Sequence, residues 1–240
     1  ILEHSPEECQ PACPHFGVCG GCTYQNLPYE KQVEMKEAQI HAMMDAAVDG
    51  DYIWEGVKES PVREAYRNKM EFSFGDEYKD GPLALGMHKR GSFHDIVNVT
   101  ECKIVDEDFR RIIKAVLEFA TDTGLPYYHR MRHTGFFRHL LVRKAVRTGE
   151  ILIDLVTTSE AQLDEARLVE KLTGLSYDGK LAGILHTTNN SLADVVKDEG
   201  TKILYGQDYF YEELLGLKFK ITPFSFFQTN SLGAEVLYET

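Results

Sequence analysis

The chain has 240 residues and a formal net charge of −12, and 43% of its residues are apolar. These values are ordinary for a folded globular protein with one large domain or two small ones. No apolar run approaches the roughly 20 residues that a membrane span needs, and the acidic balance argues against a protein coated in nucleic acid.

Charge is spread unevenly along the chain. The segment 63–147 carries 16 Lys and Arg residues against 12 Asp and Glu, a balance of +4, so the remainder carries −16. A basic central segment is compatible with a local phosphate-binding face, and ordinary surface charge explains it equally well.

The first 27 residues are rich in Pro, Gly and Cys and show no hydrophobic periodicity. Four of the five cysteines, Cys9, Cys13, Cys19 and Cys22, lie within 14 residues, and the fifth is Cys102. The opening "ILEHSPEE" contains no secretory signal, so we expect a reducing compartment, the cytoplasm, in which disulfides are the weakest interpretation. The absence of an initiator Met leads us to expect that sequence upstream is missing.

A helix is predicted from about Pro28 to Ala47, since apolar side chains recur there at helical spacing. The stripe comprises Val33, the stem of Lys36, Ile40, Met43, Met44 and Ala47. Core packing is the simplest interpretation of such a stripe.

Strands follow. Residues 66–74 alternate strictly, with Tyr66, Asn68, Met70, Phe72 and Phe74 on one face, which predicts a half-buried strand. The turn "KDGPL" leads into a second strand at 83–88, and a third is expected near 93–99.

The next element is predicted to be a helix with Asp106 as its N-cap and Gly124 at its end. Its inward positions are expected to be Phe109, Ile112, Ile113, Val116, Leu117 and Ala120. A hairpin of 137–147 with 151–158, a helix at 161–172 and a strand at 181–187 come next. Short strands at 202–205, 209–214 and 217–222 precede a helix that starts near Ser231.

Hairpins dominate this order, and β–α–β spacing is not sustained. The predicted fold class is therefore α+β, with a largely antiparallel sheet, flanking helices and an N-terminal metal-binding loop. A helix has barely begun where the sequence stops, so we also expect downstream sequence to be missing.

The cysteine spacing is C-x3-C-x5-C-x2-C, with Cys102 some 80 residues later. The C-x2-C pair Cys19/Cys22 is used by zinc and by iron–sulfur sites alike, and Gly20 and Gly21 let backbone amides turn toward sulfur. Classical zinc sites have two such pairs, or one pair and two His residues. One pair with scattered further thiols favours an iron–sulfur cluster and leaves zinc as the alternative.

Five blocks of the sequence resemble one family in its order. They are "CPHFGVCGGCTYQ" (13–25), "YRNKMEFSF" (66–74), "LGMHKRGSFHDIVNVTEC" (85–102), "FFRHLLVR" (136–143) and "ITPFSFFQTN" (221–230). Together they resemble the 23S rRNA (uracil-5-)-methyltransferases that carry an iron–sulfur cluster, over most of residues 13–240.

The resemblance implies a [4Fe-4S] cluster held by Cys13, Cys19, Cys22 and Cys102, with Cys9 as a spare thiol. The alternative is a local site in which Cys9 replaces Cys102. The cluster is expected to pin a loop that has few apolar residues of its own, with redox sensing as the rival role.

The family's chemistry is a cysteine thiolate adding to C6 of uracil, so that C5 accepts the methyl group of S-adenosylmethionine. The target base must also leave its stack. The spare Cys9 lies on an acidic loop, and the sequence shows no glycine-rich strand-to-helix turn for the cofactor. Catalytic residues are therefore expected beyond Thr240, and the chain alone is expected to be inactive. By match, Gln228 contacts S-adenosylmethionine in a site that is incomplete here; the simpler alternative is that Gln228 caps the next helix while Phe226 and Phe227 pack in a core.

The resemblance also divides the chain. Residues 1–27 form the iron–sulfur loop, 28–50 a helix that packs on the absent catalytic domain, and 51–222 the central α+β domain that faces RNA. Residues 223–240 begin a Rossmann-like S-adenosylmethionine-dependent methyltransferase domain.

RNA, specifically 23S rRNA, is the expected partner, with no membrane and no protein partner indicated. Cations among aromatic side chains typify single-stranded RNA sites. The wider set comprises Arg67, Lys69, Lys89, Arg90, Arg130, Arg132, Arg138 and Arg143, with Tyr66, Phe93, Tyr127, Tyr128 and Phe136. The expected contacts are Arg67 and Lys69 on a strand and Lys89 and Arg90 on a turn. The alternatives from other classes are a self-contained, non-enzymatic iron–sulfur or zinc RNA-binding module, and a zinc-stapled adaptor.

Overall fold

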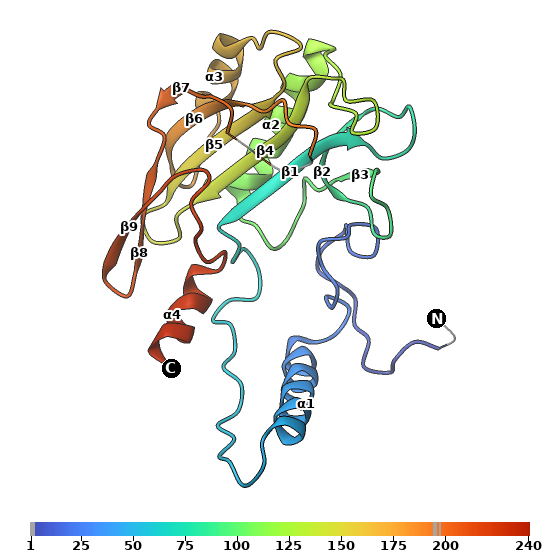
Figure 1. Cartoon of the computed structure of the whole chain (residues 1–240), viewed down its shortest axis with the longest axis vertical. Coiled ribbons are helices and arrows are strands. Elements are labelled where there is room, and N and C mark those ends of the chain that lie inside the picture. Colours follow the sequence, from blue (N-terminus) through green and yellow to red (C-terminus); the bar gives the residue numbers. More distant parts are fainter. Residues whose placement is uncertain (1–2, 194–195, 197) are drawn as a thin grey trace.

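The computed structural model describes residues 3–193, 196 and 198–240. A twisted sheet forms the body, helices cover one of its faces, and the N-terminal loop and first helix extend away from it (Figure 1). The helices are α1 (Tyr29–Ala47), α2 (Glu107–Thr123), α3 (Glu165–Thr173) and α4 (Ser231–Glu239), and the strands are β1 (Lys69–Asp76), β2 (Leu83–His88), β3 (Ile96–Asn98), β4 (Phe137–Lys144), β5 (Glu150–Thr157), β6 (Lys180–Thr188), β7 (Thr201–Gly206), β8 (Phe210–Leu214) and β9 (Leu217–Ile221). None of the helices in the described residues is long and apolar enough to cross a membrane.

The main sheet has seven strands in the order β3-β2-β1-β4-β5-β6-β7, and β8 and β9 form a separate hairpin. Every neighbouring pair in the main sheet is antiparallel except β5 and β6, which are parallel and joined through α3. The predicted α+β class with a largely antiparallel sheet is confirmed, with one β–α–β unit inside it.

Strand β1 carries the predicted alternation. Met70, Phe72 and Phe74 are buried in the main core. The strand begins at Lys69 rather than at residue 66, because the preceding amides bond outside the sheet: Arg67 N donates to Ile104 O and Asn68 N to Thr229 O, each at 2.9 Å.

Helix α2 closes the core over the sheet. The Asp106 carboxylate accepts from the amides of Asp108 and Phe109, and Gly124 ends the helix with a left-handed φ of 67°. Both predicted ends are therefore confirmed. Ile112 and Val116 are fully buried, and their packing fixes α2 against the sheet.

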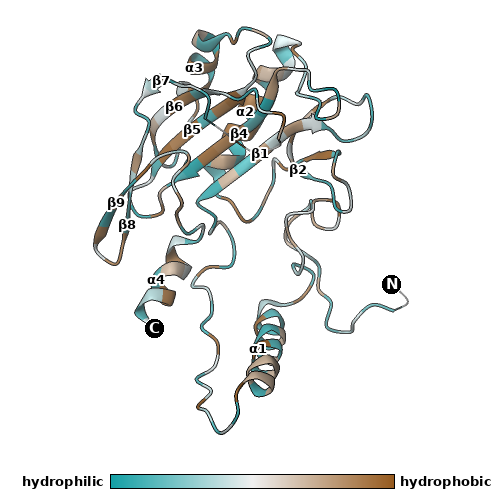
Figure 2. Cartoon of the chain, viewed as in Figure 1, coloured by the Kyte–Doolittle hydropathy of each residue, from teal (hydrophilic) through white to brown (hydrophobic). Residues whose placement is uncertain are grey.

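Helix α1 forms where it was predicted, but none of its residues is buried. Ile40 is 45% exposed and Met43 is 59% exposed, so the prediction that this stripe packs in the core is wrong for this structure. The helix stands away from the sheet, and the hydropathy colouring shows apolar residues on it with no element packed over them (Figures 1 and 2). Contacts to it come from the flanking chain: Trp54 Nε1 donates to Glu37 Oε1 at 2.8 Å, and Lys31 Nζ lies 3.2 Å from Glu7 Oε1 of the N-terminal loop.

The segment before α4 is hydrogen-bonded to the body of the protein. The buried Asn68 side chain donates to Gln228 O and to Ser231 Oγ, both at 2.8 Å. Ser231 Oγ donates in turn to the buried carboxylate of Glu212, which also accepts the amides of Val146 and Arg147. This network joins the start of β1, the β4–β5 turn, the β8–β9 hairpin and α4.

Candidate metal centre

Four cysteines line one cavity of about 170 Å³ beside the main sheet. Cys13, Cys19 and Cys22 come from the N-terminal loop, and Cys102 comes from the turn between β3 and α2. Cys13 is 7% exposed and Cys102 is 8% exposed, while the other two are half-buried. Residues about 80 positions apart in sequence thus face the same small space.

Backbone bonds hold the loop against the β2–β3 turn. Gly20 N donates to His88 O at 2.8 Å, and Arg90 N donates to Val18 O at 2.7 Å. A Cβ at Gly20 would lie 3.0 Å from the carbonyl oxygen of His88, so this close approach suits glycine. The loop therefore lies on the sheet edge as a short irregular extension, without an apolar core of its own.

The Cys102 side is fixed as well. Cys102 N donates to Val99 O at 3.1 Å, and the Arg110 guanidinium donates to Cys102 O at 3.1 Å. The Nε2 atom of His15 accepts the Glu101 amide at 3.1 Å, which joins the loop to the residue before Cys102. Burial lowers the pKa of His15, consistent with a neutral ring in this acceptor role.

The thiols lie in an environment that disfavours their ionised forms when nothing is bound. Burial raises the pKa of Cys102 to about 11 and raises the pKa values of Cys19 and Cys22. One donor already points at sulfur, since Gly21 N lies 3.3 Å from Cys19 Sγ, as predicted for the glycine pair. Binding a metal here would release thiol protons and replace them with metal–sulfur bonds.

Cys9 lies apart from this cavity. Its Sγ atom faces Gln25 O at 3.9 Å, and it is not among the residues that line the space between the other four thiols. The structure thus places Cys102, rather than Cys9, in the cavity with Cys13, Cys19 and Cys22.

The four thiols are spread around the cavity. Within residues 3–193, 196 and 198–240, no three His, Cys, Asp or Glu side chains form a group that could hold a single metal ion. A tetrahedral zinc with bonds of about 2.3 Å needs its sulfurs close together, whereas a four-iron cluster bonds each thiolate to a different iron.

The four cations predicted to contact RNA lie near this cavity. Arg67 lines it, and Lys89 pairs through its backbone with Cys19. The Arg90 guanidinium lies 5.5 Å from the centre of the Phe16 ring and donates to Cys22 O at 2.5 Å. Lys69 is half-buried at the start of β1, where burial and then the neighbouring Arg143 lower its pKa.

Two arginines of the wider basic set are structural. Arg138 and Arg143 are each 2% exposed. Arg138 donates to the carbonyls of Asn189, Ser191 and Ala193, and Arg143 to those of Pro223 and Ser225. The prediction that these two arginines belong to a solvent-facing basic surface is therefore wrong. It is also wrong for Tyr128 and Phe136, which are only 8% and 1% exposed. The spacing of residues along a strand does not show whether loops from elsewhere in the chain cover that strand.

Gln228 lies away from the cysteine cavity, on an open cavity of about 510 Å³ between residues 58–60 and α4. Its backbone carbonyl is bound by Asn68, and its side-chain amide faces Tyr238 Oη at 3.5 Å. The capping alternative is wrong, because Asn230 is the N-cap and accepts from Gly233 N at 2.9 Å. Phe226 is 88% exposed, so only Phe227 packs against a core as that alternative required.

Sequence reasoning did not single out His15 and Gln25 as part of the site. His15 lines the cavity, and Gln25 accepts the Cys13 amide through its side chain at 3.3 Å. Their positions within the cysteine segment were the available signal.

The chain is similar over its whole length to proteins described as RNA methyltransferases. No protein-family model matches it. It is 53% identical over 239 residues to a protein of Clostridium acetobutylicum described as an uncharacterized RNA methyltransferase, covering 99% of this chain and 52% of that protein. A protein of Caldanaerobacter subterraneus with the same description is 46% identical over 240 residues, covering 100% of this chain and 53% of the relative.

A solved structure shares the fold. The crystal structure of a Pyrococcus abyssi tRNA (uracil-54, C5)-methyltransferase with S-adenosyl-L-homocysteine matches with a TM-score of 0.74 and 24% identity, over 99% of this chain and 51% of that one. The chain spans about half the length of the curated relatives it matches. From end to end, therefore, the chain is related to one half of proteins described as RNA methyltransferases.

Proposed function

We propose that this chain is the cluster-bearing, RNA-facing half of an RNA (uracil-5-)-methyltransferase acting on 23S rRNA. The observation that carries the proposal is the convergence of Cys13, Cys19, Cys22 and Cys102 on one cavity, in a chain related over its full length to RNA methyltransferases. Neither feature alone supports the assignment as well, since thiol clusters occur in many classes and the relatives' descriptions name no particular RNA.

The four thiols fit a [4Fe-4S] cluster. The donor set is all sulfur, the cavity of about 170 Å³ lies between the thiols, and a backbone amide already points at Cys19 Sγ. When bound, the cluster would supply four metal–thiolate bonds that tie the N-terminal loop to the turn before α2. Two of those thiols are almost fully buried, which suits a structural role better than redox sensing.

The residues around the cavity would then position the loop for RNA. Arg90 is exposed and is held by its contacts with Phe16 and Cys22, and Lys89 is paired with Cys19 through its backbone. A loop pinned by the cluster presents these cations in a fixed geometry to phosphates of a single-stranded segment.

Methyl transfer itself is assigned to residues beyond Thr240 in the full-length protein. The proposed chemistry needs a cysteine nucleophile and S-adenosylmethionine, and Cys9 lies on an exposed acidic loop outside the cavity of the other four thiols. The structural relative was solved with S-adenosyl-L-homocysteine, the product of that cofactor. Gln228, on its open cavity, is the proposed contribution of this chain to the cofactor site.

The uncovered stripe of α1 supports a second part of the proposal. A 19-residue helix without a buried residue is marginal by itself, because most helical stability in proteins comes from packing. We assign its apolar face, including Ile40 and Met43, to contact with the catalytic domain.

The test compares this chain with a protein of the relatives' full length. Each is incubated with tritiated S-adenosylmethionine and either a 23S rRNA segment or a tRNA transcript. The full-length protein is expected to label C5 of uridine in 23S rRNA, and this chain alone is expected to label neither RNA. Labelling of tRNA instead would overturn 23S rRNA as the substrate. Turnover by this chain alone would overturn the assignment of methyl transfer to residues beyond Thr240.

A further inference from the structure

A second cavity lies at the far end of β1, away from the cysteines. This cavity of about 290 Å³ is formed by the last residues of β1, the β1–β2 turn, the residues leading into β3 and the loop 127–132. It is at the lower limit of ligand-pocket volumes, which suits a small, flat ligand. We call it the Tyr127 cavity; its charged and hydrogen-bonding residues include Asp76, Lys79, Asp80, His94, Asp95, Tyr127, His129, Arg130 and Arg132.

The Tyr127 ring is firmly held at this cavity. Its neighbour Tyr128 donates its amide to Phe137 O at 2.8 Å, and His129 N donates to Thr134 O at 2.7 Å. The loop closes tightly enough that a Cβ at Gly135, which has a φ of +117°, would lie 2.0 Å from Tyr127 O. The Tyr127 and His129 rings stack at a centroid distance of 6.3 Å. A fixed aromatic ring at a cavity edge is what an unstacked base needs.

Hydrogen-bond acceptors and cations adjoin the ring. Burial, and then the hydrogen bond to Asp76, raise the pKa of Tyr127 to about 12, so its hydroxyl stays a donor to that carboxylate. Asp80 and Asp95 offer further carboxylate oxygens, and Arg132 is exposed at the rim. The cavity thus combines a stacking surface, acceptors for N–H groups and a cation for an anion.

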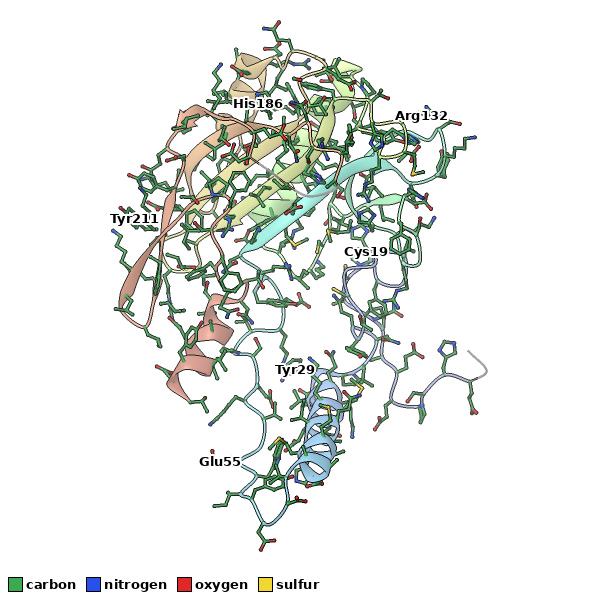
Figure 3. All side chains as sticks on the ribbon, viewed as in Figure 1. Cys19, Tyr29, Glu55, Arg132, His186 and Tyr211 are labelled. Carbon is green, nitrogen blue, oxygen red and sulfur yellow. The ribbon has the colours of Figure 1, made fainter. Side chains whose placement is uncertain are left out.

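The Tyr127 cavity is joined to the cysteine site through the β2–β3 turn. Arg130 Nη1 donates to Phe93 O at 3.3 Å and its Nη2 lies 3.0 Å from His88 Nε2. The backbone carbonyl of His88 also accepts a hydrogen bond from the amide of Gly20 in the cysteine loop. Figure 3 shows Arg132 and Cys19 on the same side of the molecule. The cysteine loop and the Tyr127 cavity are therefore joined through directly bonded residues.

We propose that the Tyr127 cavity binds one unstacked guanine nucleotide of the RNA, a specificity that rests on the RNA-facing role proposed above. The base would stack on Tyr127, its N1–H and N2 amino group would donate to the Asp80 and Asp95 carboxylates, and its phosphate would meet Arg132.

Guanine is favoured by the arrangement of donors on each base. Its Watson–Crick edge places two N–H donors side by side, so that each can meet one of the two carboxylates. Adenine and cytosine place a ring acceptor beside their amino group, and uracil places carbonyls on both sides of its N–H. Each of those edges would set an acceptor against the carboxylates and leave it unpaired.

The test measures binding of this chain to labelled seven-nucleotide uridine tracts with G, A, C or U at the centre, by fluorescence anisotropy at fixed salt. The G-containing strand is expected to bind about tenfold more tightly than the others. In D80N/D95N the G-to-A affinity ratio is expected to fall to within about twofold of unity, whereas D51N, at an exposed aspartate on the chain that returns from α1, keeps it. The ratio is informative because loss of negative charge alone strengthens binding to every strand alike.

The ring is tested separately. Tyr127→Phe keeps the aromatic face and is expected to bind within about twofold of the unaltered chain, while Tyr127→Leu keeps an apolar side chain and is expected to lose about tenfold. Equal binding of all four strands, unaffected by these variants, would overturn the guanine site and leave the RNA-facing role standing. Binding of no strand would overturn both. Guanosine monophosphate binding as tightly as the G-containing strand would assign the site to a free nucleotide.

Discussion

Cys13 and Cys102 are the least exposed thiols of the cysteine cavity, and each is held through neighbouring backbone on a different part of the chain. Burial raises the pKa of the free Cys102 thiol to about 11, so this thiol is protonated at neutral pH. Free thiols add only modest packing to the cavity, whereas a bound cluster would fix both segments at once. The same logic explains why Cys9, away from the cavity, is dispensable in this account.

A second residue with a displaced pKa gives a prediction about pH. Asp154 in β5 is almost fully buried and accepts from Thr187 Oγ1 at 2.9 Å, and burial raises its pKa to about 7. Between the unfolded pKa near 3.9 and this value, the folded chain keeps a proton that the unfolded chain loses, so stability falls as pH rises. From pH 5 to pH 8 the unaltered chain should lose roughly 1–3 kcal/mol relative to Asp154→Asn. Urea unfolding of both proteins at the two pH values measures this, and a constant difference would contradict it.

Asn68 carries the next prediction, since it joins β1 to the segment before α4. Asn68→Ala removes both side-chain donors and leaves Gln228 O and Ser231 Oγ short of a partner in a buried setting. The free energy of unfolding should fall by about 1–3 kcal/mol. Gln162→Ala, at an exposed amide, is the control and should change it by less than about 0.5 kcal/mol. Equal effects from the two substitutions would argue against the network.

At the scale of elements, α1 and α2 show how differently an apolar helical stripe can be used. Both have apolar residues at helical spacing, yet α2 buries eight side chains and α1 buries none. The difference lies in what each helix lies against: α2 covers the sheet, and α1 extends from the cysteine loop (Figure 1).

This contrast predicts opposite outcomes for two substitutions. Met43→Lys in α1 should leave the unfolding free energy of this chain within about 0.5 kcal/mol, because its side chain is already 59% exposed. Ile112→Ala in α2 should cost about 2–5 kcal/mol, since it opens a cavity in the core. In the full-length protein Met43→Lys should become destabilising, as judged by denaturant unfolding. No effect there would remove the proposed contact with the catalytic domain.

Local signals predicted the elements well where they were self-contained. The cap at Asp106, the glycine end at Gly124 and the strand at 83–88 each depend on residues close in sequence. What failed depended on distant segments. Arg138 and Arg143 were predicted among the cations of a basic surface, but carbonyls from the loops at 189–193 and 223–225 accept their hydrogen bonds. The candidate site was predictable in its cysteines, whereas the Tyr127 cavity is assembled from four separate segments and has no motif.

At the scale of the whole molecule, the cysteine loop, the β2–β3 turn and the Tyr127 cavity form one side of the sheet. Gln228 and the uncovered face of α1 are separate features, and both are assigned to the proposed catalytic domain. On the proposed function, the first group of features would face RNA and the second would face the catalytic domain. In this account the cluster fixes the side that carries the cysteine loop, and it has no contact with the reacting base.

Arg90 tests this organisation. Arg90→Ala removes an exposed cation and its contacts with Phe16 and Cys22, so RNA affinity of this chain should fall by about threefold to tenfold with a smaller salt dependence. Arg167→Ala, on α3 at an exposed pair with Asp122, is the matched control and should bind as the unaltered chain does. Binding titrations of the two variants at several salt concentrations measure this difference. Equal losses of RNA affinity in both variants would argue against a defined RNA-facing side.

The central claim is tested most directly by counting iron and acid-labile sulfide in chains purified without oxygen. The unaltered chain and Cys9→Ser should each carry about four irons and four sulfides with a broad absorbance near ~400 nm, and Cys102→Ser should lose the full cluster. Colourless protein with one zinc, or a Cys102→Ser variant that keeps four irons while Cys9→Ser loses them, would contradict the account.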